Sequence, residues 1–157
     1  MAVGQVTKYN QLETILFGTG NRPWNDATVG SCMFMLAKAT YTPSKTHLTV
    51  ADIGTAGVHY ISAGDGSPIA VSSPVIDKTT NVGESLFESA DANFGASVSC
   101  SGKYLVCVQP VTANVFASTA KLLWYVDLNT ATTASEVQAA SAEFKVVMPA
   151  LGWFRTV

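Results

Sequence analysis

The sequence predicts a mainly β protein, a single-domain antiparallel β-sandwich over residues 1–157 with one short N-terminal helix. Short stretches of β-branched and aromatic residues alternate with stretches of Ser, Thr, Gly, Asn and Ala, as strands alternate with turns. The turn signals recur at the short spacing typical of sandwiches, and no internal repeat marks a second domain. A chain of 157 residues buries roughly 70% of its unfolded surface, so one core is enough to hold it folded.

The first element that we expect is a helix from Lys8 to Phe17. Its apolar residues recur at the spacing of one helical face: Tyr9, Leu12, Ile15 and Leu16. The sequence Gly18-Thr19-Gly20 ends this pattern, and a loop rich in Asn, Asp and Pro follows it.

The next part of the chain predicts three strands. A long strand is expected from Thr28 to Ala39, and residues 44–53 have room for a short helical turn. Two shorter strands, 57–62 and 69–71, flank the pair Asp65-Gly66. This dipeptide favours a hairpin turn, because a type I′ turn needs positive φ at both central positions. We therefore expect the two shorter strands to pair with each other.

The second half predicts another hairpin and a central strand. Strands are expected at 97–100 and 103–111, joined by Ser101-Gly102. Residues 122–128 are apolar at nearly every position, so we expect both faces of this strand to be covered. Residues 129–141 are rich in Thr and Ala and predict a long segment that leaves the sheets. Short strands or ordered loops are expected near residues 75–77, 86–87, 94, 143–148 and 151–154.

Charged residues make up only 13% of the chain, with 9 Lys and Arg against 11 Asp and Glu, and the mean hydropathy is +0.26. A free soluble domain carries about twice that charged fraction, so we expect a partner to cover part of the surface. The lysines are scattered singly and the net charge is -2. This distribution argues against nucleic acid or an anionic membrane as the partner.

The start of the chain and its apolar runs predict a protein made in soluble form in the cytoplasm. Residues 1–5 have neither the basic start nor the apolar run of a signal peptide. The longest apolar run, Leu122 to Val126, is far shorter than the ~20 residues of a membrane-spanning helix.

Three cysteines, Cys32, Cys100 and Cys107, leave at least one thiol without a partner in the chain. A hairpin would bring Cys100 near Cys107, but a disulfide also needs α-carbons within about 7 Å of each other. We expect three reduced and mostly buried thiols, because the count is odd and no export signal precedes them. A bridge between Cys100 and Cys107 is the alternative.

No group of residues matches a catalytic, cofactor or metal site. The histidines His47 and His59 lie twelve residues apart without a Cys-x-x-Cys or His-x-x-x-His motif, so a zinc site is not expected. No serine lies in a Gly-x-Ser-x-Gly motif. Asp91 and Asn93 have the spacing that opens a calcium loop, but Gly95 occupies the next ligand position and no bidentate Glu follows. We therefore expect no enzymatic activity, no cofactor and no bound metal.

Two tryptophans are the candidate interface residues. Trp24 lies in a Pro-containing loop and Trp153 lies close to the C-terminus, places where a monomer would expose a large apolar ring. Tryptophan is enriched among the residues that dominate the binding energy of interfaces. The alternative is that the rings fill the core, which we favour for Phe154.

Short segments spread over most of the chain form a recognisable set. They include the expected helix end, Leu16-Phe17-Gly18-Thr19-Gly20, and the strand centre Met33-Phe34-Met35-Leu36-Ala37. The other segments are 41–47, 50–53, 58–60, 90–94, 121–128 and 152–154. Taken together, they resemble a group of small tailed-bacteriophage virion proteins.

The resemblance implies a structural role in a virion and supplies no catalytic residues. The first hypothesis is a capsid decoration (cement) protein that binds the major capsid protein and symmetry-related copies of itself. A head-tail connector or tail accessory protein is the nearest alternative. A carbohydrate-binding host-adhesion module, with Trp24 or Trp153 as the platform for a sugar ring, is the alternative of another class. A sandwich also has edge strands, and edges with few charges can extend a neighbour's sheet.

Overall fold

The computed structural model describes residues 4–12, 15, 31–77, 85–131, 135–149 and 152–156. Its elements are, in chain order, strands β1 (Thr7–Lys8) and β2 (Met33–Ala37), the 3-10 helix η1 (Val50–Ile53), and strands β3 (Ile69–Ala70), β4 (Val75–Asp77), β5 (Ser85–Glu88), β6 (Ala92–Asn93), β7 (Val98–Gly102), β8 (Tyr104–Gln109), β9 (Lys121–Asp127), β10 (Val137–Ala142), β11 (Lys145–Val146) and β12 (Phe154–Thr156).

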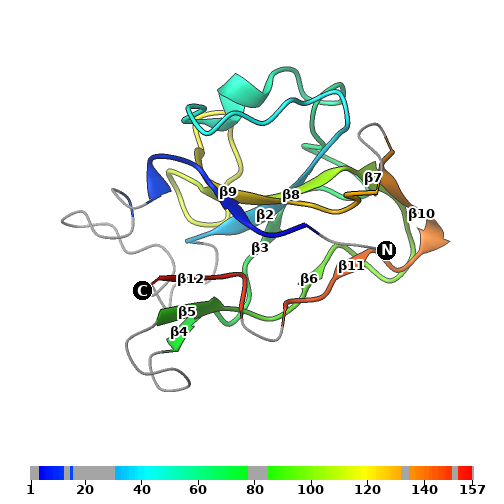
Figure 1. Ribbon diagram of the computed structural model, residues 1–157. Coiled ribbons are helices and arrows are strands. Elements are labelled where there is room, and N and C mark those ends of the chain that lie inside the picture. The colour runs from blue at the N-terminus through cyan, green and yellow to red at the C-terminus, as the bar shows by residue number, and fades with distance from the viewer. Residues whose placement is uncertain are drawn as a thin grey trace.

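Five strands form a central sheet in the order β1-β9-β8-β2-β3 (Figure 1). The middle strand is β8, which pairs antiparallel with β2 on one side and with β9 on the other. Leu122, Leu123 and Trp124 are consecutive residues of β9, and all three are fully buried. Since neighbouring side chains of a strand point to opposite faces, this burial confirms that both faces of the strand are covered.

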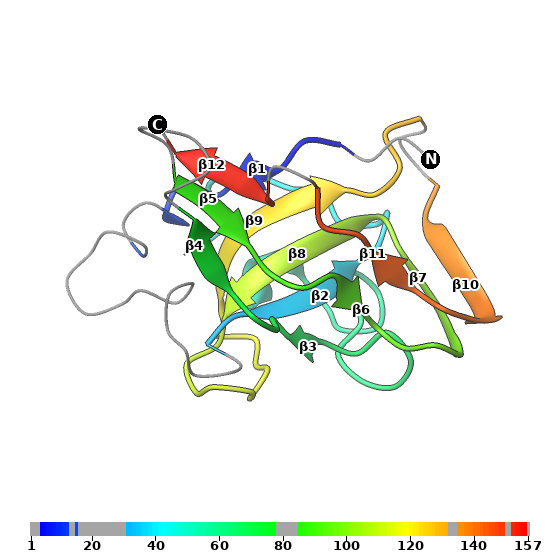
Figure 2. The ribbon, with the colours of Figure 1, turned by 90° about the horizontal axis from the view of Figure 1, so that it is seen from below.

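A second β layer covers one face of the central sheet (Figure 2). It consists of two small sheets, β12-β5-β4 and β11-β6. Aromatic rings fill the space between the layers. The ring of Trp153, just before β12, stacks on Trp124 of β9 with centroids 5.3 Å apart, and its centroid is also 5.3 Å from that of Phe34 in β2.

Loops and η1 cover the opposite face of the central sheet (Figure 1). Met35 of β2 and Val106 of β8 are buried on this side, in one apolar cluster with Val50 and Ile53 of η1. The carboxylate of Asp52 accepts hydrogen bonds from the backbone N–H groups at the start of η1, as acidic residues in a first helical turn commonly do. The expected helical turn within residues 44–53 is therefore present.

The mainly β, antiparallel class expected from the sequence is confirmed. A two-sheet sandwich is not confirmed, because the second layer is two separate short sheets and loops cover the other face. The N-terminal helix from Lys8 to Phe17 is not confirmed either. Thr7–Lys8 forms β1 against β9, and further along Ile15 N donates to Gln11 O at 3.0 Å. Residues 13–14 and 16–20 lie outside the described part of the chain.

Both predicted hairpins are wrong. β3 pairs with β2, whereas residues 57–62 form turns that contact β2 through an isolated bridge between Tyr60 and Ala37. β7 and β8 follow each other along the chain without pairing, because β7 pairs with β10 while β8 pairs with β2 and β9. The chain enters the central sheet at Lys103, whose N–H donates to Ala37 O at 2.8 Å.

Candidate binding face

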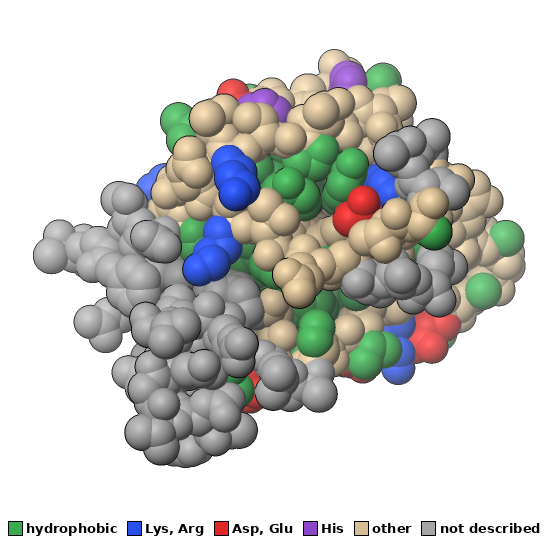
Figure 3. Space-filling view, in the orientation of Figure 1, with side chains coloured by type: hydrophobic (Ala, Val, Ile, Leu, Met, Phe, Trp, Pro, Cys, Tyr) green, Lys and Arg blue, Asp and Glu red, His purple; other side chains and the backbone are tan. Residues whose placement is uncertain are grey.

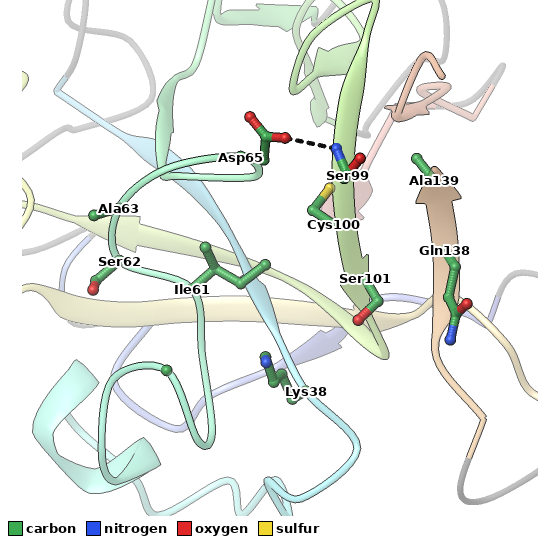
Figure 4. Close-up of a pocket in the computed structure, with 11 residues that line it drawn as sticks. Lys38, Ile61, Ser62, Ala63, Asp65, Ser99, Cys100, Ser101, Gln138 and Ala139 are labelled. Carbon is green, nitrogen blue, oxygen red and sulfur yellow. Dashed lines mark hydrogen bonds between the residues drawn. The ribbon is translucent and has the colours of Figure 1, made fainter. Parts of the chain in front are cut away.

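An open groove of about 540 Å³ lies between the loop at residues 57–65 and the strands β7 and β10 (Figure 4). Hydroxyl groups, one amide and two oppositely charged groups line most of it: Ser62, Ser99, Ser101, Gln138, Lys38 and Asp65. Such a lining suits a polar ligand or a polypeptide backbone, which it would hold by hydrogen bonds.

The loop that forms one wall of the groove is fixed to β7. Asp65 Oδ2 accepts a hydrogen bond of 2.7 Å from Ser99 N (Figure 4). The next residue, Gly66, has φ +79°, and a Cβ placed on it would lie 2.9 Å from Cys100 Cβ. Only glycine adopts this backbone conformation without strain and also leaves room for the cysteine. The groove therefore has a defined shape on this side.

Glu136 fixes the other wall, at the start of β10. Its Oε1 accepts a hydrogen bond of 2.8 Å from Ala39 N, and its Oε2 accepts one from Ser101 Oγ. One carboxylate thus joins the end of β2, the strand β7 and the start of β10. Hydrogen bonds to a charged acceptor are stronger than neutral ones, so the position of β10 is well determined.

Strand β10 is an edge strand. It pairs antiparallel with β7, with Val137 opposite Gly102 and Ala139 opposite Cys100. The register shifts between Ala139 and Ala142, where Ser141 has φ 50° and its N–H donates to Ser99 Oγ. No strand among the described residues pairs with the other side of β10. We call this side the open edge of β10.

Cys100 gives the groove no nucleophile. Burial raises the pKa of its thiol, and the nearby charge of Asp65 raises the pKa further. The thiol is therefore protonated near neutral pH, whereas reactive cysteines have lowered pKa values and positively charged surroundings. Cys100 therefore lacks the features of a nucleophilic thiol.

A second surface feature lies at the opposite end of the central sheet. Leu48, Val111 and Val115 are 53%, 77% and 55% exposed; we call them the Val111 patch. Leu48 O accepts a hydrogen bond from the N–H of Leu122 in β9, and the neighbouring residue of β9, Lys121, pairs with the end of β8, two residues before Val111. These backbone contacts place Leu48 and Val111 at the same end of the central sheet, where exposed aliphatic side chains mark a candidate interface.

The two tryptophans expected at an interface have different outcomes. Trp24 lies outside the described residues. Trp153 is 4% exposed, its ring packs on Trp124, and its Nε1 donates to Ser89 Oγ at 2.8 Å. Its apolar ring and its polar group both have partners inside the chain, so the expectation that Trp153 offers its ring to a partner is corrected to a place in the core.

The groups weighed as metal ligands bond within the protein. His47 Nδ1 lies 3.0 Å from Tyr41 Oη, and His59 Nδ1 accepts from Thr55 N. Asp91 Oδ1 accepts a hydrogen bond of 2.9 Å from Met148 N. In the part of the chain that the structure describes, no group of three His, Cys, Asp or Glu residues is arranged to hold a metal ion. No helix in this part is long and apolar enough to cross a membrane.

The three cysteines are free thiols, and Cys100 forms no bridge with Cys107. Cys32 and Cys107 are buried in the core between the two layers. Burial raises the pKa of Cys107, and a hydrogen bond with Cys32 raises it further. The expectation of reduced, mostly buried thiols therefore agrees with this arrangement.

The groove and the open edge of β10 were not expected from the sequence. The segment Val137–Ala142 consists of one Val with Gln, Ala and Ser, residues without strong β propensity. The only signal in the sequence is the short alternation of Val137, Gln138 and Ala139, and its two apolar residues do pack against the core. Comparisons of the chain with protein-family models, curated proteins and solved structures found no match.

Proposed function

We propose that this chain is a non-enzymatic structural protein of a tailed-bacteriophage virion, a decoration subunit that binds the outside of the head shell. The observation that carries the proposal is the Val111 patch. Its three aliphatic side chains are more than half exposed, whereas many other Val and Leu side chains of the chain are buried in the core. A surface that binds another protein permanently is the simplest reason to retain them.

Burial of the Val111 patch by a partner would contribute substantially to the free energy of binding. Burying one Val or Leu side chain fully contributes roughly 1.5–3 kcal/mol, so three half-exposed side chains contribute several kcal/mol when a partner covers them. Gln109 Oε1, close to the patch, is buried without a hydrogen-bond donor among the described residues. A donor from a partner or a bridging water at this position would satisfy it.

Low surface charge supports the same proposal. On the face shown in Figure 3, uncharged side chains and backbone cover most of the described surface, and charged groups are few. A subunit that lies beside identical copies on a shell must desolvate much of its surface, and charges make that costly. The resemblance of the sequence segments to virion proteins points in the same direction. The partners proposed are the major capsid protein and neighbouring copies of this chain.

The proposal is tested by binding to virus particles. Heads assembled from the major capsid protein of the phage that encodes the chain are mixed with purified protein, and bound protein is measured by sedimentation and located by electron cryomicroscopy. We expect saturable binding on the shell lattice. Density confined to the neck or tail would replace decoration with the connector or accessory role, and absence of binding to any particle would overturn the proposal.

Two matched variants make the test specific to the patch. Val111→Asp places a carboxylate at the most exposed residue of the patch. We expect its affinity for heads to fall at least tenfold, since burying an unpaired charge costs several kcal/mol. Val147→Asp is the control: Val147 is 63% exposed but follows β11, in the second layer. Equal loss of binding in both variants would contradict the assignment to the patch.

A further inference from the structure

We propose that the open edge of β10 is a strand-addition site for an extended segment of a partner protein, uncharged at its centre and flanked on both sides by Lys or Arg. The inference rests on the proposed function in one respect, that the partner is a virion protein. It is carried by a different part of the molecule, at the opposite end of the central sheet from the Val111 patch (Figure 1).

The backbone of β10 presents hydrogen-bonding groups to the outside. Ser99 N points away from β10, because it donates to Asp65. Successive residues of a strand direct their N–H and C=O groups to opposite edges. The N–H and C=O of Cys100 therefore point towards β10, and those of the opposite residue, Ala139, point towards β7. Gln138 and Ala140, on either side of Ala139, therefore direct their N–H and C=O groups outward. This places two donors and two acceptors along the open edge.

The side chains of β10 leave this edge unprotected. Proteins usually block exposed edges with Lys, Pro or strong bulges, yet Val137–Ala142 contains neither Lys nor Pro. The bulge at Ser141 disturbs only the last part of the strand. The first part is held in place by the hydrogen bonds of Glu136 to Ala39 N and Ser101 Oγ. A short, preorganised edge of this kind binds an added strand with little loss of entropy.

Charges at both ends of β10 select the occupant. Glu136 precedes the strand and Glu143 follows it, and no charged residue lies between them. If a second copy paired antiparallel along the whole of β10, Glu136 of one copy would lie opposite Glu143 of the other. Like charges directly opposite each other destabilise a strand pair, which disfavours self-pairing. A segment with basic flanks meets opposite charges at both ends.

The other charges of this region do not reverse that preference. Lys145 of β11 forms an ion pair with Asp91, with Nζ 3.8 Å from Oδ2. Lys38 and Asp65 both line the groove on the far side of β7 and are of opposite sign. The two glutamates directly adjoin β10 in the chain, and Glu143 Oε1 also accepts a hydrogen bond of 3.2 Å from Asn93 Nδ2.

The experiment uses the full chain and a fluorescent peptide of alternating Thr and Val with two lysines at each end; a second peptide carries Glu in place of Lys. We expect the Lys-flanked peptide to bind at least tenfold more tightly by fluorescence anisotropy at low salt. In Glu143→Gln we expect this preference to shrink at least threefold. Equal affinity for both peptides, or no binding of either at millimolar concentration, overturns the proposal.

Proline variants test the edge itself. Gln138→Pro removes an outward N–H without removing a β10–β7 hydrogen bond, so the fold is retained while the added strand loses a donor and meets the proline ring. We expect at least tenfold weaker peptide binding, whereas Gln138→Thr, which keeps the N–H, binds as the wild type does. Ala140→Pro with Ala140→Thr is the second pair if Gln138→Pro does not fold. Unchanged peptide affinity in a folded proline variant overturns strand addition.

Particle binding separates this inference from the proposed function. If Val111→Asp abolishes binding to heads and Gln138→Pro retains it together with peptide binding, strand addition fails and decoration stands. If the Lys-flanked peptide binds at the edge of β10 but heads never bind the chain, strand addition stands and decoration fails. Concentration-dependent dimers that Gln138→Pro removes would show a second copy as occupant and overturn the choice of partner.

Discussion

Lys103 Nζ lies 2.9 Å from Asp127 Oδ1, at the end of the ladder between β8 and β9, and Lys103 is 1% exposed while the aspartate side chain is 28% exposed. The ammonium group also donates to Asn129 O. A lysine this deeply buried requires such partners, because the cost of removing a charge from water is otherwise several kcal/mol. The pair stands where the chain turns from β7 into the central sheet.

We expect Lys103→Met to lower the free energy of unfolding by about 3 kcal/mol, because it leaves a partly buried carboxylate unpaired. Urea denaturation monitored by circular dichroism measures this loss. Lys145→Met is the control, since its pair with Asp91 is longer and more than a third exposed; we expect a loss below about 1 kcal/mol. Similar losses in the two variants would show that burial does not govern the strength of the Lys103 pair.

We expect Trp153→Ala to destabilise the fold by about 3–5 kcal/mol, the usual effect of removing a buried tryptophan. The ring stacks on Trp124, and Nε1 donates to Ser89 Oγ. Trp153→Phe retains part of the packing and should lose less. Ser89→Ala removes the acceptor of Trp153 Nε1 together with the bond that Ser89 Oγ donates to Ala90 O, and should cost about 1–3 kcal/mol. Thermal melts provide the measurement, and an unchanged Tm in Trp153→Ala would remove this residue from the core.

Alkaline pH should destabilise the protein through two buried phenols. The hydroxyls of Tyr9 and Tyr41 lie 2.9 Å apart. Burial raises the pKa of Tyr41 to about 12 and also raises the pKa of Tyr9 well above its ordinary value near 10. The folded state therefore favours the protonated phenols, and the stability that they contribute is complete below pH 10 and lost as the pH rises towards 12.

The measurement for this prediction is Tm as a function of pH in the wild type and in Tyr41→Phe. The variant loses hydrogen bonds and starts from a lower Tm, but its Tm should fall less steeply between pH 10 and 12 because one titrating group is absent. Absorbance at alkaline pH reports phenolate formation in the same samples. Parallel curves for both proteins would contradict the assignment to Tyr41.

Gly66→Ala should destabilise the wall of the groove by more than the ordinary cost of alanine at positive φ, about 1–2 kcal/mol. The added Cβ would lie 2.9 Å from Cys100 Cβ. Gly64→Ala is the matched control, because Gly64 has φ +74° and an added Cβ meets nothing within 4 Å. Chemical denaturation should show the larger loss for Gly66→Ala. If the two losses are equal, close packing against Cys100 is not what requires glycine.

The sequence predicted the elements whose apolar pattern is continuous. The burial of β9 on both faces follows from its unbroken apolar run, and the centre of β2 falls within the strand expected from Thr28 to Ala39. Pairing between distant strands was not predictable in the same way. Asp65-Gly66 has a hairpin composition, but Asp65 bonds to Ser99 of β7 instead, and tertiary contacts of this kind override local turn preference.

The candidate site was predictable only in part. Trp153 is a residue type common at interfaces, but its position in the sequence does not show that its ring stacks on Trp124 and its Nε1 donates to Ser89. The open edge of β10 depends on Glu136 bonding to Ala39 and Ser101, contacts that link segments far apart in the chain. Alanine and serine carry little pattern, so the strand that they form becomes evident only when its partner β7 is in place.

The pairing of β2 with β8 also has a kinetic consequence. Met33 lies opposite Val108 and Phe34 opposite Cys107, so about 70 residues separate strands that must meet, a separation that slows folding. A ribosome adds roughly 5–20 residues per second. The apolar strand β2 is therefore synthesised about 4–15 s before β8, and during that interval its side chains lack the strand that later covers them.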